Sequence, residues 1–250
     1  MPRRLKSNKT SKTAKISGQE TMPLNQAQAL VEVSWEVCNQ VGGIYTVIRS
    51  KVPAVTEKWK NGYCLFGPFV PEHAMGEFEE IQDKDNPFAI AADSLAKDGF
   101  EVHFGRWLVT GNPQVVLVNP KSVQSKLHDW KYFLWDHYKI SIPDSDDLAN
   151  QAFAFGMLSY LFLKSLTQAG GENLTVTAHF HEWMAGAGIP ELRREKVPVS
   201  MVFTTHATLL GRYLATNNFN FYEHLSFFDW LSESQKYGIE ARVRLERAAA

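Results

Sequence analysis

Hydrophobic and polar residues follow two different periods along the chain, and the two periods alternate. Short runs rich in β-branched and aromatic residues, bounded by turn residues, predict strands. These runs lie at residues 29–35, 63–67, 100–104, 115–118, 175–179 and 199–204. Longer segments in which apolar residues recur every three or four positions predict helices. These segments lie at residues 44–51, 87–98, 148–167, 183–195 and 239–250.

This alternation predicts an α/β fold with a largely parallel sheet flanked by helices. Residues 148–163 are apolar almost all round, which favours a helix buried between the sheet and its neighbours. Pro53 follows the helical segment at 44–51, and we expect it to perturb or end that helix. We expect one enlarged α/β domain at residues 28–250.

The first 27 residues show neither period and mix Lys, Ser, Thr and Gln, so we expect residues 1–27 to be a disordered basic tail. Residues 1–19 carry six basic residues and no acidic one, and residues 20–250 carry 20 basic and 27 acidic residues. A solvated leader is the favoured interpretation of the tail, and contact with an anionic partner is the alternative.

Composition indicates a soluble globular protein. The 250 residues are 44% hydrophobic and 12% aromatic, and the net charge of −1 gives no reason to expect nucleic-acid or membrane binding. Cys38 and Cys64 both lie in apolar stretches, which is typical of core cysteines in a reducing compartment. Without a signal sequence or an apolar stretch long enough to span a bilayer, we expect a cytoplasmic protein.

A first candidate for chemistry is the pair Gly42-Gly43, which separates a predicted strand from a predicted helix. Such a loop lets backbone N–H groups approach a phosphate at a helix N-terminus. The spacing matches neither the dinucleotide fingerprint nor the P-loop, and a simple tight turn is the alternative.

Two further candidates follow predicted strands. His179 and His181 alternate along one strand and Glu182 follows, at the carboxyl end where open α/β sheets bind ligands. A metal would need a third ligand, and none lies near in sequence, so we expect hydrogen-bonded histidines and no metal. His206 follows the last strand and Arg212 comes six positions later. An imidazole can donate to a sugar hydroxyl, and a guanidinium can hold a phosphate bidentately.

Taken together, five segments closely resemble the eukaryotic-type glycogen synthases (glycosyltransferase family 3). They are EVCNQVGGIYTVIRSK (36–51), FGRWLV (104–109), AHFHEWMAGAGIP (178–190), VFTTHATLLGRYL (202–214) and ERAAA (246–250). The resemblance implies a GT-B fold, in which two Rossmann-like lobes enclose the active site. It also implies retaining transfer of glucose from UDP-glucose to the 4-hydroxyl at a glycogen chain end, without a cofactor. The chain would be the N-terminal lobe.

By position, the resemblance assigns roles to particular residues. His206 resembles the histidine that contacts the glucosyl unit, with a catalytic and donor-binding role, and Arg212 resembles the arginine that binds the donor. Glu182 matches an acidic catalytic position at the rim of the cleft. Gly42 and Gly43 would form the loop near the diphosphate of the donor.

The sequence departs from the family in two respects. Gln40 stands just before the glycine pair, where the family usually carries Lys or Arg in the donor site. The second lobe, with its essential glutamate and the arginine cluster for glucose 6-phosphate, is absent from these residues. We therefore expect no transferase activity from this chain alone. The alternative function is a non-catalytic carbohydrate-binding or regulatory module.

Several properties stay open at this stage. The donor sugar nucleotide is UDP-glucose in the favoured interpretation and ADP-glucose in the alternative. A homo-oligomer and a glycogenin-type primer protein are open as partners besides glycogen.

Overall fold

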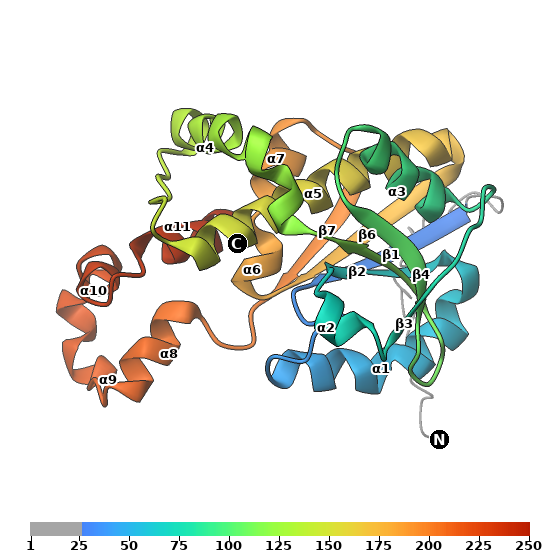
Figure 1. Cartoon of the computed structure of the whole chain (residues 1–250). Coiled ribbons are helices and arrows are strands. Elements are labelled where there is room, and N and C mark those ends of the chain that lie inside the picture. Colours follow the sequence, from blue (N-terminus) through green and yellow to red (C-terminus); the bar gives the residue numbers. More distant parts are fainter. Residues whose placement is uncertain (1–26) are drawn as a thin grey trace, which may run out of the picture.

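The computed structural model describes residues 27–250 as a mixed α/β structure (Figure 1). The predicted basic tail lies almost entirely outside the described residues. The predicted α/β fold is confirmed, because a seven-stranded sheet of order β3-β4-β5-β2-β1-β6-β7 forms the centre. The strands are β1 (Ala27–Ser34), β2 (Tyr63–Pro68), β3 (Phe78–Glu80), β4 (Val102–Trp107), β5 (Gln114–Val118), β6 (Leu174–His181) and β7 (Val199–Thr204).

The sheet is parallel from β5 to β7, and β4 alone runs in the opposite direction, because it pairs antiparallel with both β5 and the edge strand β3. The chain order reverses at β1, which has β2 on one side and β6 on the other. Open α/β sheets bind ligands beyond the carboxyl ends of their strands at such a reversal. In the register of β1 and β6, Glu32 lies beside His179 and Ser34 beside His181.

Helices cover both faces of the sheet. They are α1 (Gly43–Trp59), α2 (Pro71–Ala74), α3 (Pro87–Lys97), α4 (Gln124–Tyr138), α5 (Asp147–Gly170), α6 (Glu182–Gly186), α7 (Ile189–Arg194), α8 (Leu209–Thr216), α9 (Phe221–His224), α10 (Trp230–Lys236) and α11 (Glu240–Ala249). Short 3₁₀ turns occupy η1 (Lys60–Gly62), η2 (Pro120–Val123), η3 (Gly171–Asn173) and η4 (Leu225–Phe227). One core cluster joins α1 to the sheet and a larger one joins α3 and α5 to its other face.

The buried helix predicted at 148–163 is confirmed as part of α5. The Asp146 side chain caps its N-terminus by accepting a hydrogen bond from the Ala149 N–H (3.1 Å). Phe155 and Phe162 pack against Phe66 of β2, with ring centroids 5.4 and 5.1 Å apart. The cysteine prediction is also confirmed, because Cys38 and Cys64 are free and buried.

Two predictions about helix boundaries were wrong. Pro53 does not end α1, which continues to Trp59. An interior proline costs a helix about 3 kcal/mol, but Ile48 and Val52, which precede it in α1, are fully buried, and this packing keeps the segment helical. The helix predicted at 183–195 is instead two helices, α6 and α7. They are separated because Pro190 at the start of α7 has no N–H to donate to an earlier carbonyl.

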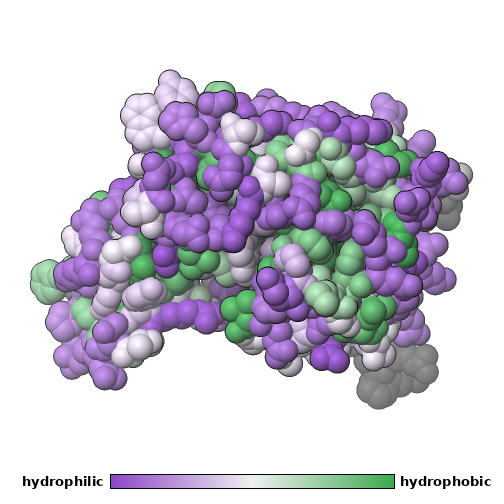
Figure 2. All heavy atoms as spheres, in the orientation of Figure 1, coloured by the Kyte–Doolittle hydropathy of each residue, from purple (hydrophilic) through white to green (hydrophobic). Residues whose placement is uncertain are grey.

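The helices α8 to α10 form a segment of their own beside the sheet, coloured orange to red in Figure 1. They share a small hydrophobic cluster with α11, formed by Leu210, Leu214, Ile239 and Val243. In the view of Figure 2, hydrophilic residues cover most of the surface and apolar side chains are interspersed among them. No helix within residues 27–250 is long and apolar enough to cross a membrane.

Candidate active site

A cavity of about 490 Å³ opens at the carboxyl ends of β1, β6 and β7, where the chain order of the sheet reverses. Its walls come from the β1–α1 loop, the start of α1, the β6–α6 junction and the segment that leads into α8. Five of the six site residues predicted from the sequence line it, namely Gly42, Gly43, Glu182, His206 and Arg212. Residues more than 160 positions apart in the sequence thus share one cavity.

The loop before α1 is held by a buried carboxylate. The Glu36 Oε2 atom accepts hydrogen bonds from the backbone N–H groups of Gly42 (2.7 Å) and Tyr45 (3.0 Å). A negative charge at this position also interacts favourably with the N-terminus of α1. Gly43 has no atom within 4 Å of where a Cβ would stand, so neither packing nor backbone conformation requires glycine there. The missing side chain leaves room at the cavity wall.

Gln40 is the predicted site residue that does not line the cavity. It is exposed on the same loop, next to the buried Asn39. The Asn39 side chain donates to the Trp35 carbonyl (2.9 Å), and its Oδ1 lies 2.6 Å from the His73 Nδ1. The loop is therefore anchored beside Gln40, whose side chain extends into solvent.

Glu182 links the two strands that end at the cavity. Its backbone has φ +66°, a left-handed conformation that costs a non-glycine residue on the order of 1–3 kcal/mol. The side chain is only 12% exposed, and its Oε1 accepts a hydrogen bond from the His206 N–H (2.8 Å). The same oxygen lies 3.5 Å from the Arg212 guanidinium. Glu182 thereby positions both residues.

The start of α8 is held by a second buried carboxylate. Both oxygens of Glu246, from α11, accept hydrogen bonds from the Leu209 N–H at 3.1 and 3.0 Å. Burial raises the pKa of Glu246 above its ordinary value, and the Leu209 N–H partly opposes that shift. Arg212, one turn into α8, is 54% exposed, and its Nε donates to the Ala207 carbonyl at 3.3 Å.

A buried polar network lies on the sheet beneath the cavity. The Lys51 ammonium of α1 lies 2.8 Å from the Glu32 Oε1 and 3.4 Å from the His181 Nε2. Burial alone would raise the pKa of Glu32, but the hydrogen bond from His179 and the charge of Lys51 lower it to about 2. Burial, together with the nearby His179 and Lys51, lowers the pKa of His181 to about 3, so its ring is neutral.

Sequence reasoning missed this network because its members come from three elements. Glu32 supplies the third donor that the histidine motif lacks in sequence, and donor atoms of Glu32, His179 and His181 lie within 4.8 Å of one another. Such a set could hold a divalent cation. The Lys51 ammonium, however, already lies against Glu32 and His181 and provides a positive charge there. Glu32 could have been noticed as the charged position inside an otherwise apolar strand.

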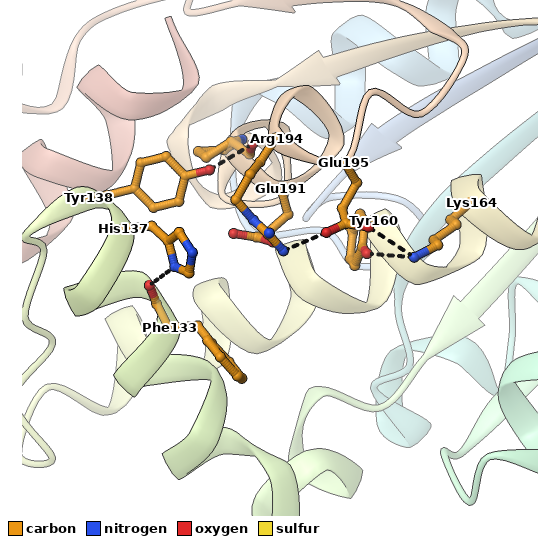
Figure 3. A network of polar contacts seen from close by, with 9 residues as sticks. Phe133, His137, Tyr138, Tyr160, Lys164, Glu191, Arg194 and Glu195 are labelled. Carbon is orange, nitrogen blue, oxygen red and sulfur yellow. Dashed lines mark hydrogen bonds and ion pairs between the residues drawn. The ribbon is translucent and has the colours of Figure 1, made fainter.

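A second hollow of about 410 Å³ lies between α4, α5 and α7 (Figure 3). In it the Tyr138 hydroxyl donates to the Pro190 carbonyl at 2.9 Å. At the rim, Arg194 lies 2.8 Å from Glu191 and 2.7 Å from Glu195. None of the predicted site residues lines this hollow, and its charged groups are paired with one another.

Comparisons with known proteins agree with the fold. The family described as glycogen synthase matches residues 32–250. The liver glycogen [starch] synthase of Homo sapiens is 40% identical over 230 residues, which are 92% of this chain and 32% of that protein. The glycogen [starch] synthase of Neurospora crassa is 39% identical over 88% of this chain and 31% of its own length. That of Caenorhabditis elegans is 38% identical over 100% of this chain and 39% of its own length.

The chain therefore spans about a third of the length of these relatives. The family match covers nearly all of the described residues, including every residue that lines the cavity. This chain belongs to the glycogen synthase family.

Proposed function

We propose that this chain is the N-terminal, donor-facing lobe of a GT-B glycogen synthase. Within the whole enzyme it would support retaining transfer of glucose from UDP-glucose to the 4-hydroxyl at a glycogen chain end. The observation that carries the proposal is the convergence of Gly42, Gly43, Glu182, His206 and Arg212 on one cavity at the reversal point of the sheet.

The cavity offers groups that suit this chemistry. When the donor bond breaks, negative charge accumulates on the departing UDP and positive charge on the sugar. The Arg212 guanidinium can take up the phosphate charge, since it is half exposed and only loosely paired with Glu182. His206 is exposed at the cavity, where its ring can contact the glucosyl unit. Glu182 remains the candidate catalytic acid group at the rim.

The space at Gly43 supports the assignment of the diphosphate to this loop. A phosphate can approach the backbone closely because no side chain intervenes, and the N-terminus of α1 favours negative charge. The Glu36 carboxylate already accepts hydrogen bonds from the N–H groups of Gly42 in the loop and Tyr45 in the first turn of α1, so it fixes the loop against the helix before the donor arrives.

Further properties follow from the same proposal. We infer a cytoplasmic enzyme that acts on glycogen without a metal or cofactor, and a second lobe that completes the cleft around the donor.

The alternative function, a non-catalytic carbohydrate-binding or regulatory module, is favoured by Gln40. An amide brings no charge where the family usually has Lys or Arg, and this side chain does not reach the cavity. Binding of UDP-glucose to this chain tests the two functions against each other. An enzyme lobe should bind the donor, whereas a module that has lost the donor site should not bind it.

Calorimetry with UDP-glucose and ADP-glucose side by side tests the proposed function directly. We expect UDP-glucose to bind more tightly than ADP-glucose, and Arg212→Ala to weaken the binding of both. Equal affinity in the Arg212→Ala variant and the unmodified protein would contradict the assigned site.

A further inference from the structure

Lys51 links the covering helix α1 to the floor of the cavity. Its Nζ lies 2.8 Å from the Glu32 Oε1 and 3.4 Å from the His181 Nε2. An ammonium group carries hydrogen-bond donors and no acceptor. The hydrogen bond between Lys51 and His181 can therefore run in only one direction, in which the Lys51 Nζ donates and the His181 Nε2 accepts.

This arrangement determines where the proton of the His181 ring lies. A neutral imidazole has one N–H donor and one acceptor nitrogen. Because Nε2 accepts, the proton is on Nδ1. The pKa of His181, lowered to about 3 mainly by burial, means that the ring does not take up a second proton near neutral pH.

The Nδ1 atom of His181 is buried, and it has no hydrogen-bond partner among residues 27–250. A buried donor without a partner costs a protein about 1–3 kcal/mol, and such groups are rare. His181 lines the cavity, and its ring lies 6.0 Å from the ring of His206, which is exposed there. An oxygen acceptor that displaces the side chains covering Nδ1 could complete the missing hydrogen bond.

We propose that Lys51 is a positioning residue that holds His181 in the Nδ1–H tautomer, so that the ring offers a neutral N–H donor to an oxygen of a bound nucleotide sugar. The identity of the ligand rests on the proposed function, whereas the tautomer does not. The Glu32 Oε1 atom holds the Lys51 ammonium in place, and the Glu32 Oε2 atom accepts a hydrogen bond from the Tyr63 hydroxyl at 3.0 Å. In this arrangement His181 donates a hydrogen bond and does not act as an acid.

Nitrogen NMR of the histidine-labelled chain at pH 7 tests the tautomer without any ligand. The His181 signals are identified by their loss in His181→Gln. We expect a protonated Nδ1 and an unprotonated Nε2, which is the less common form of free histidine. A protonated Nε2, or a ring protonated on both nitrogens, would overturn the inference.

Two substitutions test the role of Lys51. A guanidinium also carries only donors, so Lys51→Arg should keep the Nδ1–H tautomer, while Lys51→Met should shift the ring toward Nε2–H. An unchanged tautomer in Lys51→Met would show that Lys51 does not control it. Because Lys51→Met leaves Glu32 buried without its cation, the double variant Glu32→Gln/Lys51→Met repeats the test with both charges removed, and the same shift is expected.

Titration with UDP-glucose then separates the inference from the proposed function. We expect the Nδ1 signal to move more than the Nε2 signal, and Lys51→Met to bind about tenfold more weakly than Lys51→Arg. Binding of UDP-glucose that leaves the Nδ1 signal unchanged would contradict the proposed contact between Nδ1 and the ligand. Failure of the unmodified chain to bind UDP-glucose would argue against the proposed function and the ligand assigned to Nδ1, while the ligand-free spectrum decides the tautomer.

Discussion

Arg212 is largely exposed and forms only a weak ion pair with Glu182. A side chain in this state is available to bind a ligand. Its guanidinium is 54% exposed and lies 3.5 Å from the Glu182 Oε1. Ion pairs so open to solvent contribute about 0–1 kcal/mol to stability. A phosphate that presents two oxygens can therefore compete with Glu182 for the guanidinium. Arg212 should matter for catalysis and little for folding.

We predict that Arg212→Ala, in the complete enzyme, lowers kcat/KM by the equivalent of about 2 kcal/mol or more, because a cation at the leaving phosphate is lost. The free energy of unfolding should change by less than about 1 kcal/mol. Steady-state kinetics and urea denaturation measure the two effects. Arg106→Ala on β4, away from the cavity, is the matched control and should leave kcat/KM unchanged. Kinetics of Arg212→Ala close to those of the unmodified enzyme would refute the assignment.

His181 should make stability depend on pH in a specific range. Its pKa is about 3 in the folded protein and 6.5 when it is not perturbed. Below pH 6.5 the unfolded state binds a proton on this ring that the folded state does not bind. The free energy of unfolding therefore decreases by up to about 1.4 kcal/mol for each unit by which the pH is lowered. The burial of the ring is what produces this loss.

We predict that His181→Gln flattens the stability curve between pH 6.5 and 4, because an amide does not titrate. Urea denaturation at several pH values measures the difference between the variant and the unmodified chain. The exposed His224, replaced in the same way, serves as the control and should leave the slope unchanged. A His181→Gln curve parallel to that of the unmodified chain would contradict the buried neutral histidine.

At the residue scale, the sequence could indicate the site residues that lie in recognisable motifs. It could not indicate the residues that anchor them through hydrogen bonds. Gly42, Gly43, His206 and Arg212 lie in such strings, and all four line the cavity. The Glu246 carboxylate accepts a hydrogen bond from the Leu209 N–H, which is 37 residues away in the sequence. Only the tertiary fold brings the two groups together. Gln40, by contrast, stands in a recognisable string and yet lies outside the cavity.

At the scale of elements, the position of α6 depends on a close approach between two backbones. A Cβ added at Gly156 of α5 would lie 2.6 Å from the Gly188 nitrogen and 2.7 Å from the Ala187 backbone carbon. Real Cβ atoms do not come so close to the backbone, so a side chain at position 156 would push apart α5 and the α6–α7 junction. That junction follows α6, whose first residue is Glu182 of the cavity.

We predict that Gly156→Ala destabilises the protein by about 1–3 kcal/mol through overpacking, although alanine is the better helix former. Thermal and urea denaturation measure the change. Gly76→Ala is the control, because a Cβ at Gly76 meets no atom within 4 Å, and it should change stability by less than about 0.5 kcal/mol. A Gly156→Ala variant as stable as the control would mean that α5 and the α6–α7 junction can move apart without lowering the free energy of unfolding.

Sequence periodicity found the buried elements and failed for the exposed or short ones. The buried strands and α5 show clear apolar patterns, since the sheet and its covering helices bury them. By contrast, α4 buries only Leu134, so its many aromatic residues follow no clear apolar period. The edge strand β3 has three residues and α9 has four, which are too few for a period to appear.

For the molecule as a whole, residues 27–250 line the cavity from the carboxyl ends of three strands and from the segments that follow those strands. In the GT-B arrangement that we propose, the donor lies between two lobes, and this chain provides one of them. The groups assigned here would bind and orient the donor, but the leaving phosphate and the acceptor sugar must also be enclosed and shielded from water. Orientation on one side alone cannot supply the full lowering of the barrier.

We therefore predict that the 250-residue chain catalyses no measurable glucosyl transfer, even where it binds UDP-glucose. The measurement is UDP release in a coupled assay with glycogen as primer, compared with a blank that lacks the primer. A full-length synthase, such as the human liver relative, serves as the positive control under the same conditions. Primer-dependent UDP release by this chain above the blank, with matching growth of the α-1,4-glucan, would show that one lobe suffices. In that case the cavity at β1, β6 and β7 would have to contain the whole catalytic site.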